Sequence, residues 1–307
     1  MESEKEKEKL NKFAERIFLS LNAKNKDEII TEVIINTDLD KRIEISNVYL
    51  QKYDRDLYTD LKSKLNGQFK ELAMYLFLPP EEYMSKILKK VLKGFQIDEI
   101  AIYEIFTICT QDELKKIESC FKKETGKELK SEIEKNFPSA IRKNLLNLLN
   151  TPRNINERPN KTLCEKLAQN LIDVSENSWV ANEDIFKKIF ISRSAEELVL
   201  ISRYYFKKTG EHIINIIEKR LTNKIRNLLK ELIYNVIMPE ELFADKINIA
   251  LKNNNISLLN RILVSRNQID LKEIKEIYQL KYKNDLKNDI KLKTFGTHQK
   301  LCLHLIN

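Results

Sequence analysis

Residues 190–210 read FISRSAEELVLISRYYFKKTG, and the spacing within this stretch decides the fold. Ser194 is followed by Ile201 after seven positions and by Tyr205 after another four. Serine accepts hydrogen bonds from the free N–H groups at a helix start. An isoleucine and an aromatic residue four positions apart lie on one helix face. Gly210 marks the expected helix end, so the stretch predicts a capped helix that turns one apolar face toward a core.

The same spacing occurs four times, and the copies begin 72, 84 and 73 residues apart. Two of them, TQDE at 110–113 and SAEE at 194–197, predict capping boxes, in which the glutamate reaches back to the cap residue. Such repetition indicates units that bury a full core only by packing helix against helix. The cap, isoleucine and aromatic positions are Asp38, Ile45 and Tyr49; Thr110, Ile117 and Phe121; Ser194, Ile201 and Tyr205; and Asn267, Ile274 and Tyr278.

Composition agrees with an all-α protein. Of the 307 residues, 42% are hydrophobic and 33% are charged, and there are only 5 glycines and 6 prolines. The start, MESEKEKEKL, lacks the apolar core of a secretion signal. The four cysteines form no CxxC pair, which favours reduced thiols in the cytoplasm. The net charge of +8 points to acidic partners.

The repeats predict a division of the chain. The longest interval contains TPRNINERPNK at 151–161, which we interpret as a Pro- and Asn-rich linker between two halves. The expected parts are a charged N-terminal tail (1–9), repeat I (10–78), repeat II (79–150), the linker (151–161), repeat III (162–236) and repeat IV (237–307).

Four stretches together resemble the annexin family. They are EISNVYLQKYDRDLYTDLKSKLNGQFKEL (44–72), LKGFQIDEIAIYEIF (92–106), FISRSAEELVLISRYYFKKTG (190–210) and ILVSRNQIDLKEI (262–274). The resemblance covers nearly the whole chain, and the Lys-, Ile- and Asn-rich composition is more similar to the protist α-giardins than to animal members. It implies four repeats of about five helices each, forming a slightly curved disc whose convex face is bridged by calcium to acidic phospholipid.

The annexin resemblance also implies a calcium site in each repeat, made by a glycine-rich first loop and an acid near the end of the fourth helix. Calcium takes six to eight oxygen ligands, so the carboxylate matters for affinity. In the first loop of repeat I (21–25), Asn22 and Lys24 stand where glycines are expected. Repeat II keeps Gly94, repeat III has SWVAN without glycine, and the loop of repeat IV is two residues short.

The position of the acid is changed in every repeat. The register places it at Lys64, Asn136, Arg220 and Lys293. None is an acid and three are cations, which repel a divalent ion. We therefore expect ordinary calcium binding to be weak or lost. A lesser calcium site at a non-standard place is predicted around Asp60, Asn66 and Gly67.

The replacements have two possible roles. Lys64, Arg220 and Lys293 could contact polyanions directly, or they could simply complement the dipole at a helix C-terminus. Trp179 and Phe95 fall at loop tips, where each could anchor in a membrane or fold back onto its own repeat.

The sequence contains no phosphate-binding glycine loop, no HExxH motif and no nucleophile with a plausible partner. We therefore predict a non-enzymatic peripheral scaffold at the membrane–cytoskeleton boundary, located in the cytoplasm. Its expected partner is acidic phospholipid or an acidic cytoskeletal protein, with self-association possible and with neither nucleic acid nor a small-molecule substrate expected. The alternatives are an ordinary calcium-dependent phospholipid-binding annexin and a calcium-independent module for acidic cytoskeletal proteins.

Overall fold

The computed structural model describes residues 2–93, 98–151, 158–173, 187–220 and 223–307. Within these ranges the chain forms nineteen α-helices and one short π-helical segment, and it contains no strand. The all-α prediction is confirmed. No helix of this described part is long and apolar enough to cross a lipid bilayer.

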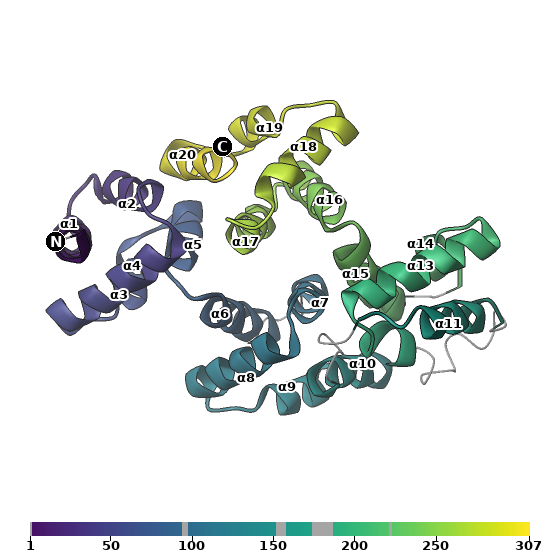
Figure 1. Ribbon diagram of the computed structural model, residues 1–307. Helices are drawn as coiled ribbons and strands as arrows, with labels where there is room; N and C mark the ends of the chain where they lie inside the picture. Colours follow the sequence, from purple (N-terminus) through teal and green to yellow (C-terminus); the bar gives the residue numbers. More distant parts are fainter. Residues whose placement is uncertain (1, 94–97, 152–157, 174–186, 221–222) are drawn as a thin grey trace. The chain divides into compact units, whose positions relative to one another are not determined.

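The helices follow one another in four groups, which is the predicted repeat architecture (Figure 1). The first group is α1 (Glu2–Ser20), α2 (Lys26–Ile35), α3 (Leu39–Tyr53), α4 (Leu57–Lys64) and α5 (Gly67–Tyr75). The second is α6 (Pro80–Lys93), α7 (Glu99–Ile108), α8 (Gln111–Thr125), α9 (Leu129–Asn136) and α10 (Ser139–Asn150). The third is α11 (Lys161–Asp173), the π segment η2 (Lys187–Ile191), α13 (Ala195–Thr209), α14 (Ile213–Arg220) and α15 (Asn223–Ile237). The fourth is α16 (Pro239–Lys252), α17 (Ile256–Arg266), α18 (Leu271–Tyr282), α19 (Leu286–Lys293) and α20 (Gly296–Leu305).

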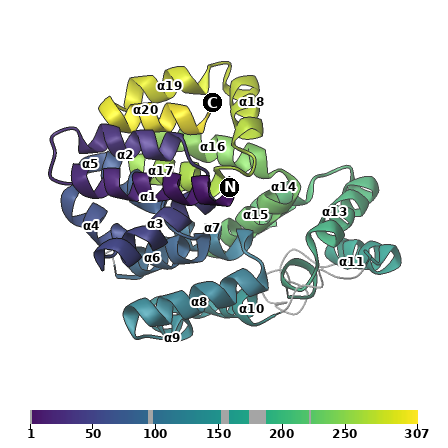
Figure 2. The same cartoon turned by 60° about the vertical axis from the view of Figure 1, so that its left-hand side comes forward.

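The chain forms two compact units. Unit 1 comprises Met1–Tyr83 and Phe243–Asn307, and unit 2 comprises Met84–Leu242. In unit 1, α2 packs against α20 and α5 packs against α17, so the first and fourth groups share one core (Figure 2). In unit 2, α7 packs against α15. The stretch 151–161 therefore joins two groups of the same unit and does not separate the two units. The exact repeat boundaries stay predictions.

The charged segment at the N-terminus continues the first helix. We expected a tail over 1–9, whereas α1 already begins at Glu2. Glutamate and lysine have high helix propensity, and oppositely charged residues four positions apart add some support. Glu8 and Lys12 form such a pair at 2.7 Å.

The predicted caps are observed at the start of three of the third helices. The residues whose side chains accept a backbone N–H bond there are Asp38, Thr110 and Ser194. Thr110 and Glu113 form the complete capping box. At Ser194 only half of the predicted box is present, because the Glu197 carboxylate lies 3.6 Å from the Arg193 guanidinium and not at the cap.

The fourth copy starts differently, and the prediction of a cap at Asn267 is wrong. Asn267 ends α17, and α18 begins only at Leu271. Gln268 adopts a left-handed φ of 63°, which interrupts the helical path between them. The Asp270 carboxylate is held by Arg266, whose Nε donates at 2.8 Å, and it does not cap α18.

The apolar faces and the helix ends of the four copies agree with the sequence. The isoleucine and aromatic side chains are buried in all four, at Ile45, Tyr49, Ile117, Phe121, Ile201, Tyr205, Ile274 and Tyr278. Gly126 and Gly210 end α8 and α13 with φ of 70° and 72°, as predicted. Asp54 and Lys283 take the same left-handed position after α3 and α18, with φ of 51° and 57°.

Candidate functional site

The four replacement residues share one structural position. Lys64, Asn136, Arg220 and Lys293 are each the last residue of an eight-residue helix. These helices are α4, α9, α14 and α19, the fourth elements of their groups. Carbonyl groups at a helix C-terminus lack intrahelical partners and carry partial negative charge, which favours a cation nearby.

In the first group, the helix end and the first loop are joined by Lys64. Its ammonium donates a hydrogen bond of 2.7 Å to the side-chain oxygen of Asn22. Asn22 belongs to the loop 21–25, which connects α1 to α2. Lys64 and Asn22 are 42 residues apart in sequence. The Lys64 side chain therefore connects the loop to the helix end. At this place the annexin resemblance implies a calcium ion.

The fourth group repeats this arrangement with a different loop. Lys293 donates a hydrogen bond of 3.1 Å to the side-chain oxygen of Asn254. The loop that connects α16 to α17 covers 253–255 and is two residues shorter than the loop 21–25, as the sequence indicated. Asn254 has a φ of 52°, in the left-handed region that asparagine tolerates. Loops of two lengths thus bring an asparagine to a lysine at the helix end.

The second and third groups are less fully described. The Asn136 amide donates a 2.7 Å hydrogen bond to the Glu132 carbonyl of its own helix. Gly94 and Phe95 lie outside the described residues, as does Trp179. The backbone of Arg220 ends α14, whereas its side chain is not described.

The side chains at the ends of α4 and α19 are not a suitable set of ligands for calcium. Calcium requires several oxygen ligands, usually including a carboxylate. Here the helix end supplies an ammonium, and that ammonium already uses the asparagine oxygen of the loop. In the described part of the chain, no three His, Cys, Asp or Glu side chains are grouped so that they could hold a metal ion.

The lesser site predicted near Asp60 has a different environment from the one that the sequence suggested. The Asp60 carboxylate accepts hydrogen bonds from Arg55, at 2.8 Å and 2.5 Å, and from the Tyr49 hydroxyl at 2.7 Å. The Arg55 guanidinium holds the pKa of this carboxyl below its usual range. Asn66 precedes α5 and Gly67 begins it with a φ of 63°. A cation at Asp60 would have to compete with Arg55.

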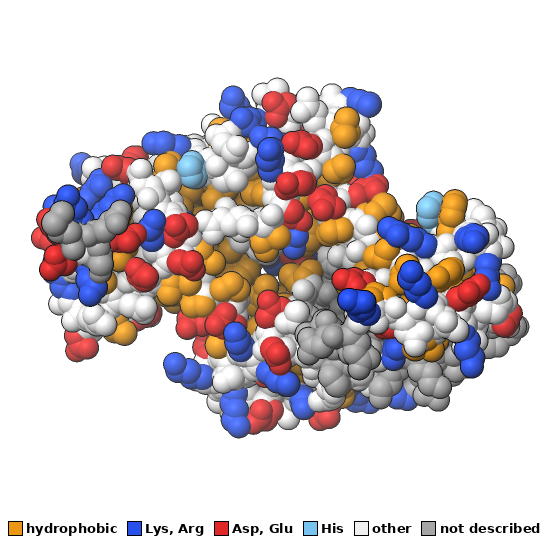
Figure 3. All heavy atoms as spheres, viewed as in Figure 1, with side chains coloured by type: hydrophobic (Ala, Val, Ile, Leu, Met, Phe, Trp, Pro, Cys, Tyr) orange, Lys and Arg blue, Asp and Glu red, His pale blue; other side chains and the backbone are white. Residues whose placement is uncertain are grey.

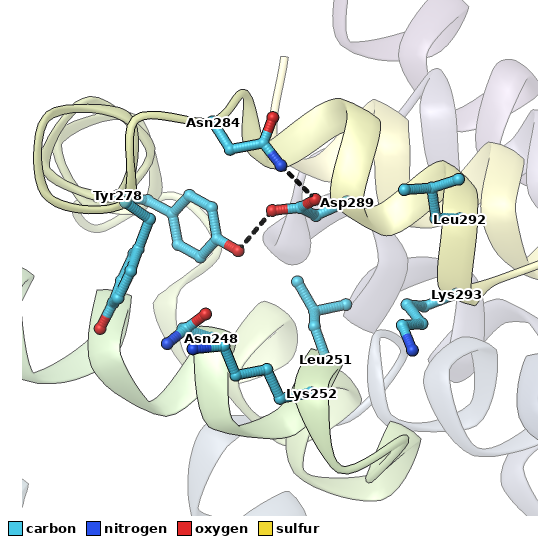
Figure 4. Close-up of a pocket in the computed structure, with 9 residues that line it drawn as sticks. Asn248, Leu251, Lys252, Tyr278, Asn284, Asp289, Leu292 and Lys293 are labelled. Atoms are coloured by element: carbon cyan, nitrogen blue, oxygen red, sulfur yellow. Dashed lines mark hydrogen bonds between the residues drawn. The ribbon is translucent and has the colours of Figure 1, made fainter.

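Sequence reasoning missed a pocket in the fourth group, with a volume of about 390 Å³. Tyr278 and Asn284 donate hydrogen bonds to the Asp289 carboxylate inside it, at 2.7 Å and 2.5 Å. Figure 4 shows these groups facing Asn248 and Lys252 of α16. A signal for the pocket existed in the sequence, because the four-repeat register places Asn284 where the first group has Arg55.

Charged side chains are distributed over the surface without a single continuous basic region on the face drawn in Figure 3. Lysine and arginine side chains alternate there with aspartate and glutamate over the described elements. Exposed ion pairs also occur in the described part of the chain, such as Lys52 with Glu15 at 3.0 Å. On this face, positive charge is therefore present as local groups of lysine and arginine side chains.

Comparison with known proteins gives a consistent result. A family model described as Annexin matches residues 83–148 and 243–305. Annexin A7 of Homo sapiens is 27% identical over 282 residues, which cover 91% of this chain and 58% of that protein. Annexin A13 of Mus musculus is 28% identical over 297 residues, which cover 96% of this chain and 94% of that protein. The chain thus spans little more than half the length of the annexin A7 relative.

Solved structures agree in fold. The structure of annexin III is similar to this chain with a TM-score of 0.90 at 28% identity, covering 97% of this chain and 93% of that one. The calcium-bound structure of alpha-14 giardin has a TM-score of 0.80 at 14% identity, covering 97% of this chain and 99% of that one. At that identity the giardin similarity concerns the fold alone.

Proposed function

Because this chain belongs to the annexin family, we propose that it is a non-enzymatic peripheral scaffold in which calcium-dependent binding to acidic phospholipid is weak or lost. Binding of acidic phospholipid through calcium is typical of the family. The supporting observation is the pair of lysine–asparagine bridges, Lys64 to Asn22 and Lys293 to Asn254. Each bridge places a fixed positive charge between the first loop and the fourth helix of its group.

Fixed charge offers another way to attach to an acidic surface. The last turn of α4 contains Lys62 and Lys64, and the last turn of α19 contains Lys291 and Lys293. A lysine or arginine near an anionic membrane contributes about 1 kcal/mol, and this contribution falls as salt screens it. Four such lysines would give a weak, salt-sensitive attachment that needs no calcium.

The same lysines could instead only stabilise their helices, because cations near a C-terminus complement the helix dipole. The two roles predict different results. Substitution of a lysine that acts only on its helix lowers the stability of the protein and leaves vesicle binding unchanged. Substitution of a lysine that contacts lipid weakens vesicle binding even when stability is retained.

The test is co-sedimentation with phosphatidylserine vesicles, in millimolar calcium or in chelator, each at low and at physiological salt. Our proposal expects equal binding with and without calcium, and weaker binding at the higher salt. The variant Lys64→Gln/Lys293→Gln should reduce sedimentation, whereas the matched pair Lys272→Gln/Lys300→Gln, exposed on α18 and α20, should not. Binding that requires calcium would contradict the proposal and favour an ordinary calcium-dependent annexin.

An acidic cytoskeletal protein is the second candidate partner, because the same lysines suit any acidic surface. Microtubule co-sedimentation at the same two salt concentrations tests it. Protein that sediments with microtubules and not with vesicles would move the proposed attachment from lipid to protein. We also propose a cytoplasmic location at the membrane–cytoskeleton boundary, and self-association. A weak calcium site around Asp60, Asn66 and Gly67 stays a proposal, in which calcium would have to displace the Arg55 guanidinium from the Asp60 carboxylate.

A further inference from the structure

Two side chains that line the pocket of the fourth group differ from their counterparts in the first group. When the buried faces of α1 and α16 are matched, Asn248 takes the place of Phe18. In the first group, the Phe18 ring stacks on Tyr53, with centroids 3.9 Å apart and ring planes within 4°. In the fourth group, the corresponding Tyr282 lines an open pocket of about 390 Å³. This volume is within the range of small-ligand sites, about 300–1,000 Å³.

The second difference concerns the carboxylate. In the first group, Arg55 covers Asp60 with two charged hydrogen bonds, at 2.8 Å and 2.5 Å. In the fourth group, Asn284 stands at the arginine position, and its neutral amide donates to Asp289 at 2.5 Å. The negative charge of Asp289 is therefore not neutralised by a guanidinium as that of Asp60 is.

We propose that this pocket binds an ammonium group joined by a short linker to a phosphate, the chemistry shared by an aminophospholipid headgroup and free O-phosphoethanolamine. The lipid form of the ligand rests on the proposed function, because it requires attachment to a membrane. The pocket chemistry itself does not, and a soluble ligand can test it alone.

The ammonium end fits the inner part of the pocket. The Asp289 carboxylate accepts one hydrogen bond from Tyr278 and one from Asn284. A carboxylate has about four acceptor positions on its two oxygens, so further N–H donors can be accommodated. The ring of Tyr278 also lines the pocket (Figure 4), and aromatic faces attract cations.

The phosphate end fits the lysines. Lys252 projects from α16, and Lys293 follows Asp289 by one helical turn on α19 (Figure 4). Side chains four residues apart on a helix have Cβ atoms about 5–6 Å apart, a distance that a short linker spans. Asn254 uses one of the three N–H groups of Lys293. Two lysines face the phosphate and one aspartate faces the ammonium, so the opposite charges at the two ends of the ligand are each matched. The excess of one positive charge also complements free O-phosphoethanolamine, whose net charge is about −1, whereas the lipid headgroup is a zwitterion without net charge.

The surroundings of the pocket favour the lipid as the source of this headgroup. Leu292 lines the pocket and is 72% exposed, and Phe295, three residues later, is 74% exposed. Large apolar side chains beside basic residues are typical of surfaces that enter the membrane interface. A headgroup that entered with its ammonium first would leave its phosphate at Lys252 and Lys293 and its acyl chains outside the pocket.

The first experiment measures soluble binding to the full chain in chelator, by calorimetry, with O-phosphoethanolamine and with inorganic phosphate. We expect O-phosphoethanolamine to bind about tenfold more tightly than phosphate, because only it contacts Asp289. Asn248→Phe, which introduces the aromatic residue of the first group, should weaken binding at least about tenfold. Asp289→Asn should remove the preference over phosphate.

The matched control is Ile249→Phe, which adds an aromatic ring at the next residue of α16, where the side chain is 50% exposed. It should bind like the wild type, and thermal melting of all variants establishes that they fold. Equal affinity for both soluble ligands, or affinity unaffected by Asn248→Phe, would overturn the proposal.

The second experiment separates the lipid from the free compound and from the proposed function. Phosphatidylcholine vesicles with phosphatidylethanolamine should bind wild-type protein better than vesicles without it, and Asn248→Phe should abolish the difference. Soluble binding without this vesicle effect would support the pocket and overturn the lipid as its ligand. Salt-sensitive binding to phosphatidylserine vesicles that persists in Asn248→Phe, together with no soluble binding, would overturn the pocket proposal while the proposed function stands.

Discussion

Reversing the charge at two helix ends should strengthen calcium binding. The variant Lys64→Glu/Lys293→Glu replaces the last residue of α4 and of α19 by a carboxylate. It also removes the ammonium groups that use the side-chain oxygens of Asn22 and Asn254. Each loop oxygen then becomes available beside a new carboxylate, which is the kind of oxygen-rich surrounding that calcium prefers.

The magnitude follows from the charges involved. Two unit charges about 4 Å apart in water interact by about 1 kcal/mol, so an ammonium repels divalent calcium by about 2 kcal/mol and a carboxylate attracts it equally. The substitution therefore changes the interaction by about 4 kcal/mol per site. A Debye length of about 8 Å at physiological salt leaves roughly 60% of this, about 2.4 kcal/mol. That energy corresponds to an affinity gain of roughly fiftyfold.

The assay is calorimetric titration with calcium chloride, followed by co-sedimentation with phosphatidylserine vesicles over a calcium series. We expect weak binding by the wild type and about fiftyfold tighter binding by the variant. The matched control is Lys62→Glu/Lys291→Glu, which makes the same charge change two residues earlier in each helix, at exposed positions. Side chains two residues apart do not face each other on a helix, so the control should gain little.

Two results would refute this reasoning. An equal gain in the control pair would mean that overall charge, and not the position at the helix end, determines calcium affinity. Tight calcium binding by the wild type would mean that backbone carbonyls and acids elsewhere make a sufficient site. The lysine bridges would then be broken at little cost when calcium binds.

Three further predictions concern stability, measured by urea unfolding. Lys283→Gly should raise the free energy of unfolding by up to about 1 kcal/mol, because lysine is strained in the left-handed conformation and glycine is not. The greater entropy of glycine in the unfolded chain offsets part of this gain. Gly126→Ala should lower the free energy of unfolding, because Gly126 is also left-handed. Burial lowers the pKa of His298 to about 4, so the unfolded chain binds more protons between about pH 6.5 and 4. Stability should fall by up to about 3 kcal/mol as the pH falls through that window, and His298→Gln should show a smaller fall. Ile201→Ala should cost about 2–5 kcal/mol, because this fully buried side chain would leave a cavity; a loss below 1 kcal/mol would contradict its place in the core.

The features that the sequence predicted well are those set by local chemistry. A cap residue, an apolar pair and a left-handed glycine each act within one or two helical turns, so Thr110, Ile117 and Gly126 could be read directly. The prediction failed at Asn267 because a neighbouring ion pair changed the local competition. Arg266 binds Asp270, and the chain turns before α18 begins. Nothing in the spacing of the repeat revealed that this pair would form.

The candidate sites depended on contacts between distant segments. Aligning the repeats located the positions of Lys64 and Lys293, but their partners Asn22 and Asn254 lie 42 and 39 residues away. Predicting the pocket would have required a comparison of Phe18 with Asn248, which belong to different groups. Their difference matters only because each lies beside a tyrosine ring, Tyr53 or Tyr282. A substitution by a smaller side chain is hard to recognise as a pocket from one sequence, because the space that it leaves depends on the side chains packed around it in the fold.

The two lysine bridges each connect a first loop to a helix end through side chains alone. In the first group the bridge spans a five-residue loop, and in the fourth it spans a three-residue loop with a left-handed asparagine. The backbone paths of the two loops differ, yet in both a lysine ammonium donates to an asparagine side-chain oxygen, at 2.7 Å and at 3.1 Å. An ammonium at the end of a helix is favoured by the helix dipole whether or not the loop contacts it. The loop asparagine adds a hydrogen bond to a charge that is already stable there, so the connection persists without calcium, and chelator should leave the melting temperature unchanged.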